Sequence, residues 1–168
     1  MRIRTSRIIN VPREMLWPVL THSRMDVPGW FCLGLPRPVS CELPQSPGGV
    51  GAERRCISDR GTVIQKITNW QPPERLQFRM VSTDHGWGPW VESLEEDFRL
   101  ERCDRGTRIT RTTNIRAKGW LPRIKEIGFY LGLKRVHRFV FENWRVMSEQ
   151  GAPPNAGRAD APPPSRVP

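Results

Sequence analysis

The order of its segments constrains the fold of this chain more than any other feature of the sequence. Strand-like residues 2–10 lead into a short helical stretch at residues 12–20. Strand-like segments divided by turn residues then run from about residue 39 to residue 117, and an amphipathic helix follows at residues 120–150. An antiparallel sheet followed by one long helix predicts an α+β fold in which the sheet curls around the helix. A curled sheet does not close tightly on a single helix, so we expect a cavity between them.

The length and composition are typical of one soluble domain. With 168 residues, of which 37% are hydrophobic and 26% charged, the chain is long enough to bury a core of its own. We assign residues 1–150 to this domain and residues 151–168, rich in proline and alanine, to a disordered tail. No apolar run approaches the roughly 20 residues that a membrane-spanning helix needs. The first residues enter a strand pattern without an apolar signal region, and we expect a cytoplasmic protein.

The basic excess leaves the nature of the partner open. A net charge of +10 with a pI near 10.7 is compatible with nucleic acid, a lipid head group or an acidic ligand. The basic residues, however, are spread over most of the chain, and arginine outnumbers lysine. We therefore interpret most of them as a solvated surface and expect no stable complex with nucleic acid. Nothing in the sequence predicts an oligomeric state.

The cysteines show neither metal-ligand nor redox-motif spacing. Cys32, Cys41, Cys56 and Cys103 contain no Cys-x-x-Cys pair and have no histidine close by in the sequence. We interpret all four as free thiols in a reducing cytoplasm. The three histidines are well separated, so we predict no metal site. With no phosphate-binding glycine loop and no nucleophile elbow in the sequence, we expect no cofactor.

Short turns divide the middle of the chain into hairpins. The predicted strands cover residues 50–58, 62–70, 75–83, 92–101 and 107–116, and most are joined by connections of only a few residues. Connections this short predict an antiparallel meander. Because strand residues alternate between faces, one set of side chains should point inward together.

The predicted inner face mixes apolar and polar side chains. It comprises Leu76, Phe78, Met80, Ser82, Leu94, Glu96, Phe98, Leu100, Ile109, Arg111, Thr113 and Ile115. If the turn at residues 103–106 closes the last hairpin, Phe98 faces Arg111. Glu96 then faces Thr113 and becomes a diagonal neighbour of Arg111, close enough to pair with it.

Glu96 and Arg111 are the strongest candidates for buried polar groups. Charges inside a cavity must be paired or solvated, because isolated burial is costly. Arg111 could hold a carboxylate, phenolate or enolate, and Glu96 could orient such a ligand or act as a base. The alternative is that both side chains lie on the outer face, which follows if the strand alternation is shifted by one residue.

The loop at residues 83–90 combines two glycines and a proline with two tryptophans. In the functional interpretation, Trp87 and Trp90 cover the entrance of the cavity and stack on a flat ligand, with His85 as a polar contact. In the structural interpretation, the two rings cap the end of the sheet and His85 is solvated. Trp30, with its neighbour Phe31, is a candidate for the opposite side of the entrance, or alternatively for plain core packing.

The last helix shows apolar residues at steps of three and four. The predicted stripe comprises Leu121, Ile124, Ile127, Leu131, Val136, Val140, Trp144 and Met147. His137 lies beside this stripe, and we expect it to pack between the helix and the core, with a catalytic role as the alternative.

Four motifs, in the right order, resemble the START-like (SRPBCC, birch-pollen-allergen) superfamily. Residues 11–20 are similar to its "ap-e-vw-l" opening helix, and residues 49–55 to its "G-vG-a-R" strand. Residues 67–76 are similar to the "v-w-pp-rl" hairpin, and residues 98–110 to the "f-l…gtrvt" hairpin. Together the motifs cover about residues 3 to 150, and the polyketide cyclase/dehydrase and lipid-transport branch is the most similar.

The resemblance implies the helix-grip fold. In this fold a curved antiparallel sheet wraps around a long C-terminal helix, with two short helices after the first strand. The superfamily includes both carriers and enzymes, so the fold alone does not define a function. Our leading hypothesis is binding of a hydrophobic or aromatic small molecule, such as a lipid or a polyketide, in the cavity. The alternatives are a polyketide cyclase or dehydratase and a basic module that binds acidic lipid or nucleic acid through the outer face of the last helix.

Overall fold

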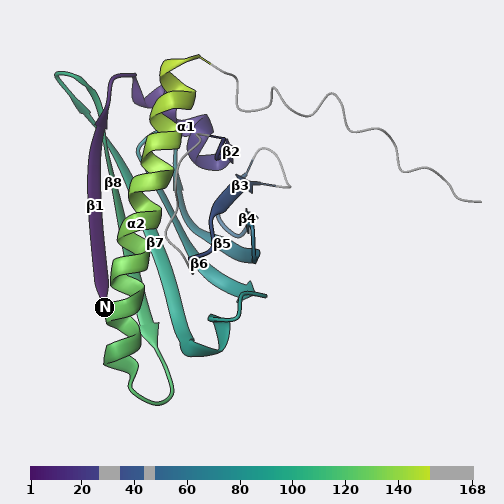
Figure 1. Ribbon diagram of the computed structural model, residues 1–168. Coiled ribbons are helices and arrows are strands. Elements are labelled where there is room, and N and C mark those ends of the chain that lie inside the picture. The colour runs from purple at the N-terminus through teal and green to yellow at the C-terminus, as the bar shows by residue number, and fades with distance from the viewer. Residues whose placement is uncertain (27–34, 44–47, 152–168) are drawn as a thin grey trace, which may run out of the picture.

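In the computed structural model an eight-stranded antiparallel sheet curls around one long helix (Figure 1). The structure describes residues 1–26, 35–43 and 48–151. Its elements are β1 (Arg2–Ile9), α1 (Arg13–Thr21), β2 (Ser23–Arg24), β3 (Pro38–Glu42), β4 (Glu53–Ser58), β5 (Gly61–Gln71), β6 (Arg75–Thr83), the short 3-10 helix η1 (Gly88–Trp90), β7 (Val91–Cys103), β8 (Gly106–Ala117) and α2 (Pro122–Glu149). This arrangement confirms the predicted helix-grip α+β fold.

The strand order follows the chain, apart from the first strand. The sheet runs β1-β8-β7-β6-β5-β4-β3-β2, so β1 returns to pair with the last strand. In the last hairpin, Cys103 pairs with Gly106 and Phe98 with Arg111. The short turn sets the register of this hairpin, and the predicted pairing is confirmed.

One short helix after β1 belongs to the described residues. Helix α1 begins at Arg13, after Pro12, and buries Leu16, Val19 and Leu20 against the sheet. The second short helix that the fold family implies would follow it. Residues 27–34 of that connection lie outside the described residues, as does Trp30. The same holds for residues 152–168 of the expected tail.

The core lies between the concave face of the sheet and α2. Alternation is clear in β7, which buries Leu94, Glu96, Phe98 and Leu100. In β8, every residue of the run 109–113 is buried. The larger core cluster joins sheet residues such as Phe78 and Phe98 to Val140, Phe141 and Trp144 of α2. Only the half of α2 that follows Gly132 contributes to this larger cluster.

The predicted apolar stripe of α2 is wrong in its first half. Ile124, Ile127 and Leu131 are exposed, and the first half of α2 instead packs Phe129 and Leu133 against the sheet. The sequence interpretation crossed from Leu131 to Val136, and a step of five residues on an α-helix turns through about 140°, to another face. From Phe129 through Leu133, steps of three and four residues lead to the buried residues in the second half of α2 and stay on the same face of the helix.

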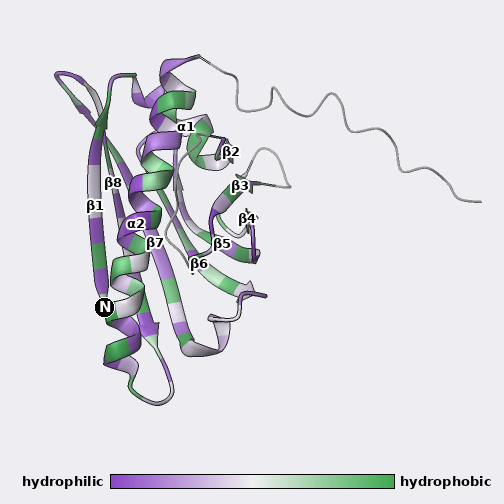
Figure 2. Cartoon of the chain, in the orientation of Figure 1, coloured by the Kyte–Doolittle hydropathy of each residue, from purple (hydrophilic) through white to green (hydrophobic). Residues whose placement is uncertain are grey.

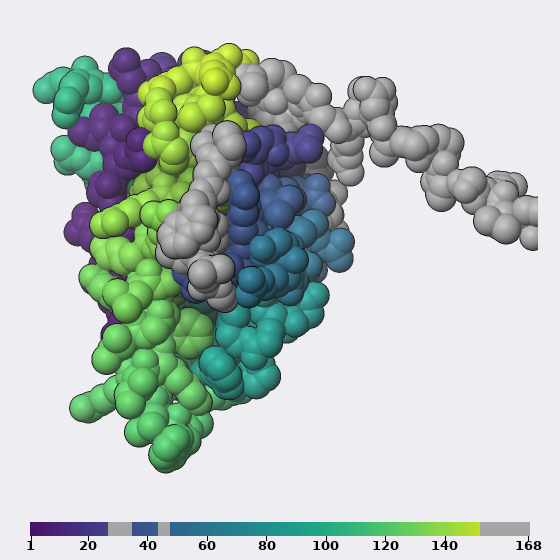
Figure 3. Space-filling view, viewed as in Figure 1, coloured from purple at the N-terminus to yellow at the C-terminus, as the bar shows by residue number. Residues whose placement is uncertain are grey.

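The start of α2 is the part of the molecule that reaches furthest beyond the sheet (Figures 1 and 3). Figure 2 shows apolar residues in its first turns, at this projecting end. In the described ranges, no helix is both long enough and apolar enough to cross a membrane.

Two of the four cysteines do not behave as expected. Cys41 and Cys56 form a disulfide, whereas Cys103 is free and Cys32 lies outside the described residues. Cys41 and Cys56 are direct partners in the β3–β4 pairing, with their Cα atoms 4.1 Å apart. Residues opposite each other in adjacent antiparallel strands are close enough for such a bond. The spacing of 15 residues gave no sign of this pairing, because it depends on the register of two strands joined by a long connection.

Candidate functional site

A cavity of about 200 Å³ lies between the sheet and α2. Its wall on the helix side includes Phe129, Leu133, Val136, Val140 and Trp144. Its polar lining comes from the sheet and the β6–β7 connection, through Ser58, Gln65, His85, Glu96 and Arg111. The rest of the lining is mostly apolar, as is typical of small-molecule sites with a few orienting polar groups.

Glu96 and Arg111 form a buried ion pair on the inner face. The Arg111 guanidinium donates through Nη2 to Glu96 Oε1, and the Thr113 hydroxyl donates to the same oxygen over 3.3 Å. The guanidinium carbon also lies 5.2 Å from the centre of the Phe98 ring. The predicted diagonal pairing is confirmed. A charge-assisted hydrogen bond inside the protein is stronger than one in water.

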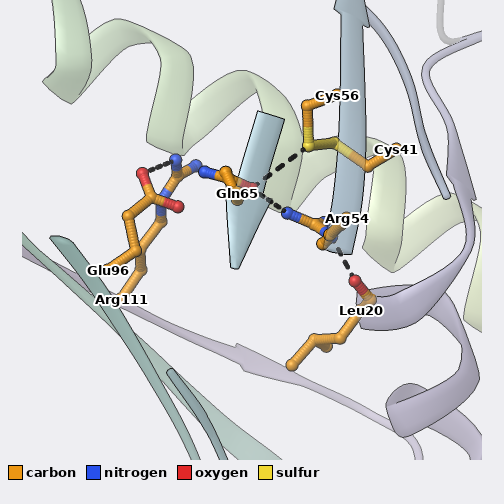
Figure 4. Close-up of a disulfide and its surroundings, with 7 residues drawn as sticks. All are labelled: Leu20, Cys41, Arg54, Cys56, Gln65, Glu96 and Arg111. Carbon is orange, nitrogen blue, oxygen red and sulfur yellow. Dashed lines mark hydrogen bonds and ion pairs between the residues drawn. A yellow bond between two sulfur atoms is a disulfide. The ribbon is translucent and has the colours of Figure 1, made fainter. Parts of the chain in front are cut away.

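A second arginine, Arg54 of β4, is buried beside this pair (Figure 4). It donates through Nη1 to Gln65 Oε1 over 3.0 Å and through Nη2 to the carbonyl oxygen of Leu20 over 2.9 Å. Its guanidinium carbon lies 4.7 Å from the centre of the Phe78 ring. Burial lowers the pKa of Arg54 to about 10, with the Glu96 charge raising it and the Arg111 charge lowering it. Arg54 is therefore a charged group at neutral pH.

The cluster formed by Arg54, Glu96 and Arg111 carries unequal charge. Two buried guanidinium groups lie near a single carboxylate. The Nε atoms of both arginines are buried and have no hydrogen-bond partner among the described residues. An excess of buried positive charge is costly in free energy unless a negative charge compensates it.

Gln65 links this cluster to the disulfide. Its Oε1 accepts from Arg54 and lies 3.5 Å from Cys56 Sγ (Figure 4). A disulfide sulfur carries no proton, so the second contact is a van der Waals contact and not a hydrogen bond. Cys41 and Cys56 also line the cavity, which makes the disulfide part of its wall.

His85 provides a second polar position in the cavity lining. Its ring stacks on Trp87, with centroids 5.3 Å apart, and its Nε2 lies 3.3 Å from the Ser58 hydroxyl oxygen. Trp87 in turn meets the Phe129 ring of α2 edge-on, with centroids 6.1 Å apart. Burial lowers the pKa of the His85 imidazole, with nearby Asp84 opposing this shift, so that the ring is neutral at pH 7.

Half of the ten predicted site residues lie in the cavity lining: His85, Trp87, Glu96, Phe98 and Arg111. Phe78 and Thr113 are buried behind that lining, and Met80 is partly buried in the smaller core cluster. Trp90 is 51% exposed, lies 5.6 Å from the Lys125 ammonium and is not part of the lining. Trp30 lies outside the described residues.

The sequence interpretation missed several residues of the cavity lining, and it also missed Arg54, which is buried but is not part of the lining. Gln65 and Ser58 lie on strands that we expected, but their polar side chains gave no sign of burial. Arg54 was accessible to reasoning: Arg54 and Arg55 are adjacent on one strand, and alternation requires one of them to face the core. Phe129 and Leu133, which line the cavity on the helix side, were missed because the predicted apolar stripe lies on the wrong face of α2 in its first half.

His137 packs between α2 and the sheet, as expected. Its Nε2 lies 3.0 Å from the Thr113 hydroxyl oxygen and its Nδ1 lies 3.0 Å from that of Thr5. Burial lowers the pKa of His137 to about 2, helped by the positive charges of Arg111 and Lys134. A neutral ring that is fully enclosed ties the helix to β1 and β8 and is not a proton donor at neutral pH.

The described residues provide no obvious place for a metal ion. No group of three or more His, Cys, Asp and Glu side chains is arranged to bind one in those ranges. The polar side chains in the cavity lining are those of Arg111, Glu96, Gln65, His85 and Ser58.

Comparisons with known proteins identify the fold. No family model matches the chain, and no curated protein matches its sequence. The ZhuI aromatase/cyclase from Streptomyces sp. R1128 has a TM-score of 0.65 and 16% identity, over 89% of this chain and 94% of that chain. Ara h 8.0201 has a TM-score of 0.64 and 17% identity, over 89% of this chain and 98% of that chain.

DynU16, from the dynemicin biosynthetic locus, has a TM-score of 0.58 and 19% identity, over 91% of this chain and 49% of that chain. Identities this low carry the fold and not the activity. The structural matches agree with the motifs in the sequence and with the observed order of strands and helices. The chain therefore shares the helix-grip fold of these solved structures.

Proposed function

We propose that the protein binds a largely apolar small molecule with one anionic group in the cavity between the sheet and α2. The observation that carries this proposal is the cluster of Arg54, Glu96 and Arg111, where two buried guanidinium groups lie near one carboxylate, which is paired with Arg111. Arg111 reaches the cavity directly, and its Nε has no partner among the described residues. A carboxylate, phenolate or enolate of the ligand is the natural partner for this group.

The apolar lining supports the remainder of the ligand. Phe98 and Trp144 are in tilted contact with each other, their centroids 5.5 Å apart, and both line the cavity. Leu94, Ile115 and Val140 extend the same apolar wall. Burial of apolar ligand surface against these side chains supplies most of the affinity, whereas Arg111 fixes the orientation.

Two fluorescent probes of similar size and different charge test this proposal. Anilinonaphthalene sulfonate is anionic, and N-phenyl-1-naphthylamine is its neutral counterpart. We expect Arg111→Gln to weaken binding of the anionic probe about 10-fold and to change binding of the neutral probe by less than about 2-fold. The matched control is Arg108→Gln, on the exposed face of the same strand.

The outcome separates an anion-binding cavity from a purely apolar one. Equal losses for both probes would show that Arg111 only maintains the shape of the cavity. No loss for either probe would place binding elsewhere. The binding constants should be expressed per folded molecule, because Arg111 is also part of a buried ion pair.

A polyketide cyclase or dehydratase activity is the second candidate. The favourable observation is His85, a neutral imidazole in the cavity lining with the Ser58 hydroxyl 3.3 Å away. A neutral imidazole can take up a proton at pH 7, as carbanion formation next to a carbonyl group requires. Catalysis predicts that a poly-β-ketone substrate is consumed over many turnovers and that His85→Gln stops this. A carrier would bind the same molecule once and return it unchanged.

A further inference from the structure

Large apolar side chains are exposed at the beginning of α2. Trp120 is 81% exposed, Leu131 65% and Ile124 61%, with Ile127 and Leu121 also exposed. We call these five residues the α2 entry face. It occupies the helix end that projects beyond the sheet (Figures 2 and 3). So much exposed apolar surface in one place is typical of an interaction site.

The helical residues of the α2 entry face share one side of α2. Steps of three and four residues connect Ile124, Ile127 and Leu131, whereas Trp120 and Leu121 directly precede the helix. On the same side of the second half of α2, the helix carries charged residues such as Arg138. The apolar character is therefore confined to the projecting end and is not a property of the whole helix.

Basic side chains surround this apolar surface. Lys118, Arg123 and Lys125 lie on or next to the first turns of α2, and none of them forms an ion pair in the part of the chain that the structure describes. The nearest carboxylate on the helix, Glu126, instead accepts from the backbone amide of Ala117 over 3.3 Å. The face therefore combines apolar bulk with uncompensated positive charge.

We propose that the α2 entry face docks on the surface of an anionic phospholipid bilayer. Its aliphatic side chains can enter the boundary between head groups and acyl chains, and a tryptophan such as Trp120 is favoured at this depth. Its lysines and Arg123 are attracted to the negative head groups. Nucleic acid is a poorer partner because phosphates and bases offer nothing to Ile124, Ile127 and Leu131.

The location of the face connects it with the cavity. Phe129 and Leu133 line the cavity from the same turns of α2 that carry Ile124, Ile127 and Leu131 on the opposite side. Docking through this face brings one thin wall of the cavity against the bilayer. The helix thereby holds the cavity next to a source of apolar, negatively charged ligands.

Sedimentation with lipid vesicles tests the docking directly, using the full chain. The probes are vesicles of phosphatidylcholine alone and vesicles with about 30% phosphatidylglycerol. We expect about 10-fold stronger partitioning to the anionic vesicles at about 0.1 M salt, and a clear loss at about 0.5 M salt. The double variant Ile124→Asp with Leu131→Asp should lower that partitioning about 10-fold, without unfolding, since both side chains are exposed.

Matched controls place the same changes elsewhere on the surface. Val50→Asp with Val81→Asp alters two apolar residues that are 70% and 53% exposed, far along the chain from α2, and should leave partitioning unchanged. Arg123→Glu should weaken it, whereas Arg105→Glu, in the β7–β8 turn, should not.

Two results would overturn the proposal. In the first, the wild-type protein does not sediment with anionic vesicles at low salt. The same result would be found if the α2 entry face bound an acidic protein and not a bilayer. The other is equal partitioning of the wild type and the Ile124→Asp, Leu131→Asp variant. Neither result affects binding of the fluorescent probes in the cavity, so this proposal and the proposed function fail independently.

Discussion

Replacing Glu96 by glutamine removes the only carboxylate from the buried charge cluster and keeps the shape of the side chain. In the wild type, Glu96 accepts from both Arg111 and Thr113, and its charge also stabilises the charged form of Arg54. In Glu96→Gln, the amide oxygen can still accept hydrogen bonds. Among the described residues, no other carboxylate then pairs with the two buried guanidinium groups.

Breaking a buried ion pair by removing one partner typically costs about 3–5 kcal/mol. Because glutamine preserves the packing and part of the hydrogen bonding, we expect the lower end, a loss of about 3 kcal/mol in the free energy of unfolding. The neighbouring residue supplies the control. Glu95 points to the exposed face of the same strand, and Glu95→Gln should change stability by less than about 0.5 kcal/mol.

Urea unfolding followed by tryptophan fluorescence measures both variants. A double-mutant cycle with Arg111→Met isolates the pair itself, and we expect a coupling energy of about 1.5 kcal/mol or more. An anionic ligand should stabilise Glu96→Gln more than it stabilises the wild type, because it replaces the missing charge. If Glu96→Gln is no less stable than Glu95→Gln, the buried cluster does not carry the excess charge that we infer.

Three further predictions concern stability. The pKa of His137 is about 2 in the folded protein and about 6.5 in the unfolded chain, so the neutral ring stabilises the fold above pH 6.5 and this contribution is lost as the pH falls. In urea unfolding, the free energy of unfolding should be about 1.4 kcal/mol lower at pH 5.5 than at pH 7.5. His137→Gln should not show this difference. Cys41→Ser opens a disulfide loop of 15 residues and should lower the unfolding free energy by about 3 kcal/mol under oxidising conditions, but not with reductant present. Gly128→Ala should raise the melting temperature, because a Cβ at this position meets nothing within 4 Å and alanine favours a helix over glycine by about 1 kcal/mol. Gly132→Ala should raise the melting temperature less, because its Cβ would lie 2.9 Å from a leucine methyl group.

The register of the last hairpin could be predicted from the sequence because a short turn determines it. Once Cys103 lies opposite Gly106, strand alternation places Glu96 and Arg111 on the inner face as diagonal neighbours. The same reasoning placed Phe98 in the core. Local rules of this kind need no knowledge of distant segments, and they placed Glu96, Phe98 and Arg111 correctly in the cavity lining.

Features of the structure that depend on long-range packing could not be predicted from the sequence. The apolar residues of α2 occupy two faces, and only the position of the helix on the sheet determines that Phe129 and Leu133 are buried while Ile124 and Leu131 are exposed. The pairing of Cys41 with Cys56 likewise depends on how β3 meets β4. Neither fact has a local signature.

Native mass spectrometry of the protein, purified gently from its own host, tests the central claim most directly. We predict a species heavier than the chain by the mass of one small molecule, which is lost on denaturation and identified in the extract as an apolar anion. The Arg111→Gln variant, purified in the same way, should retain less of it. A wild-type protein that is folded and carries no such molecule, and that binds neither fluorescent probe, would contradict the account.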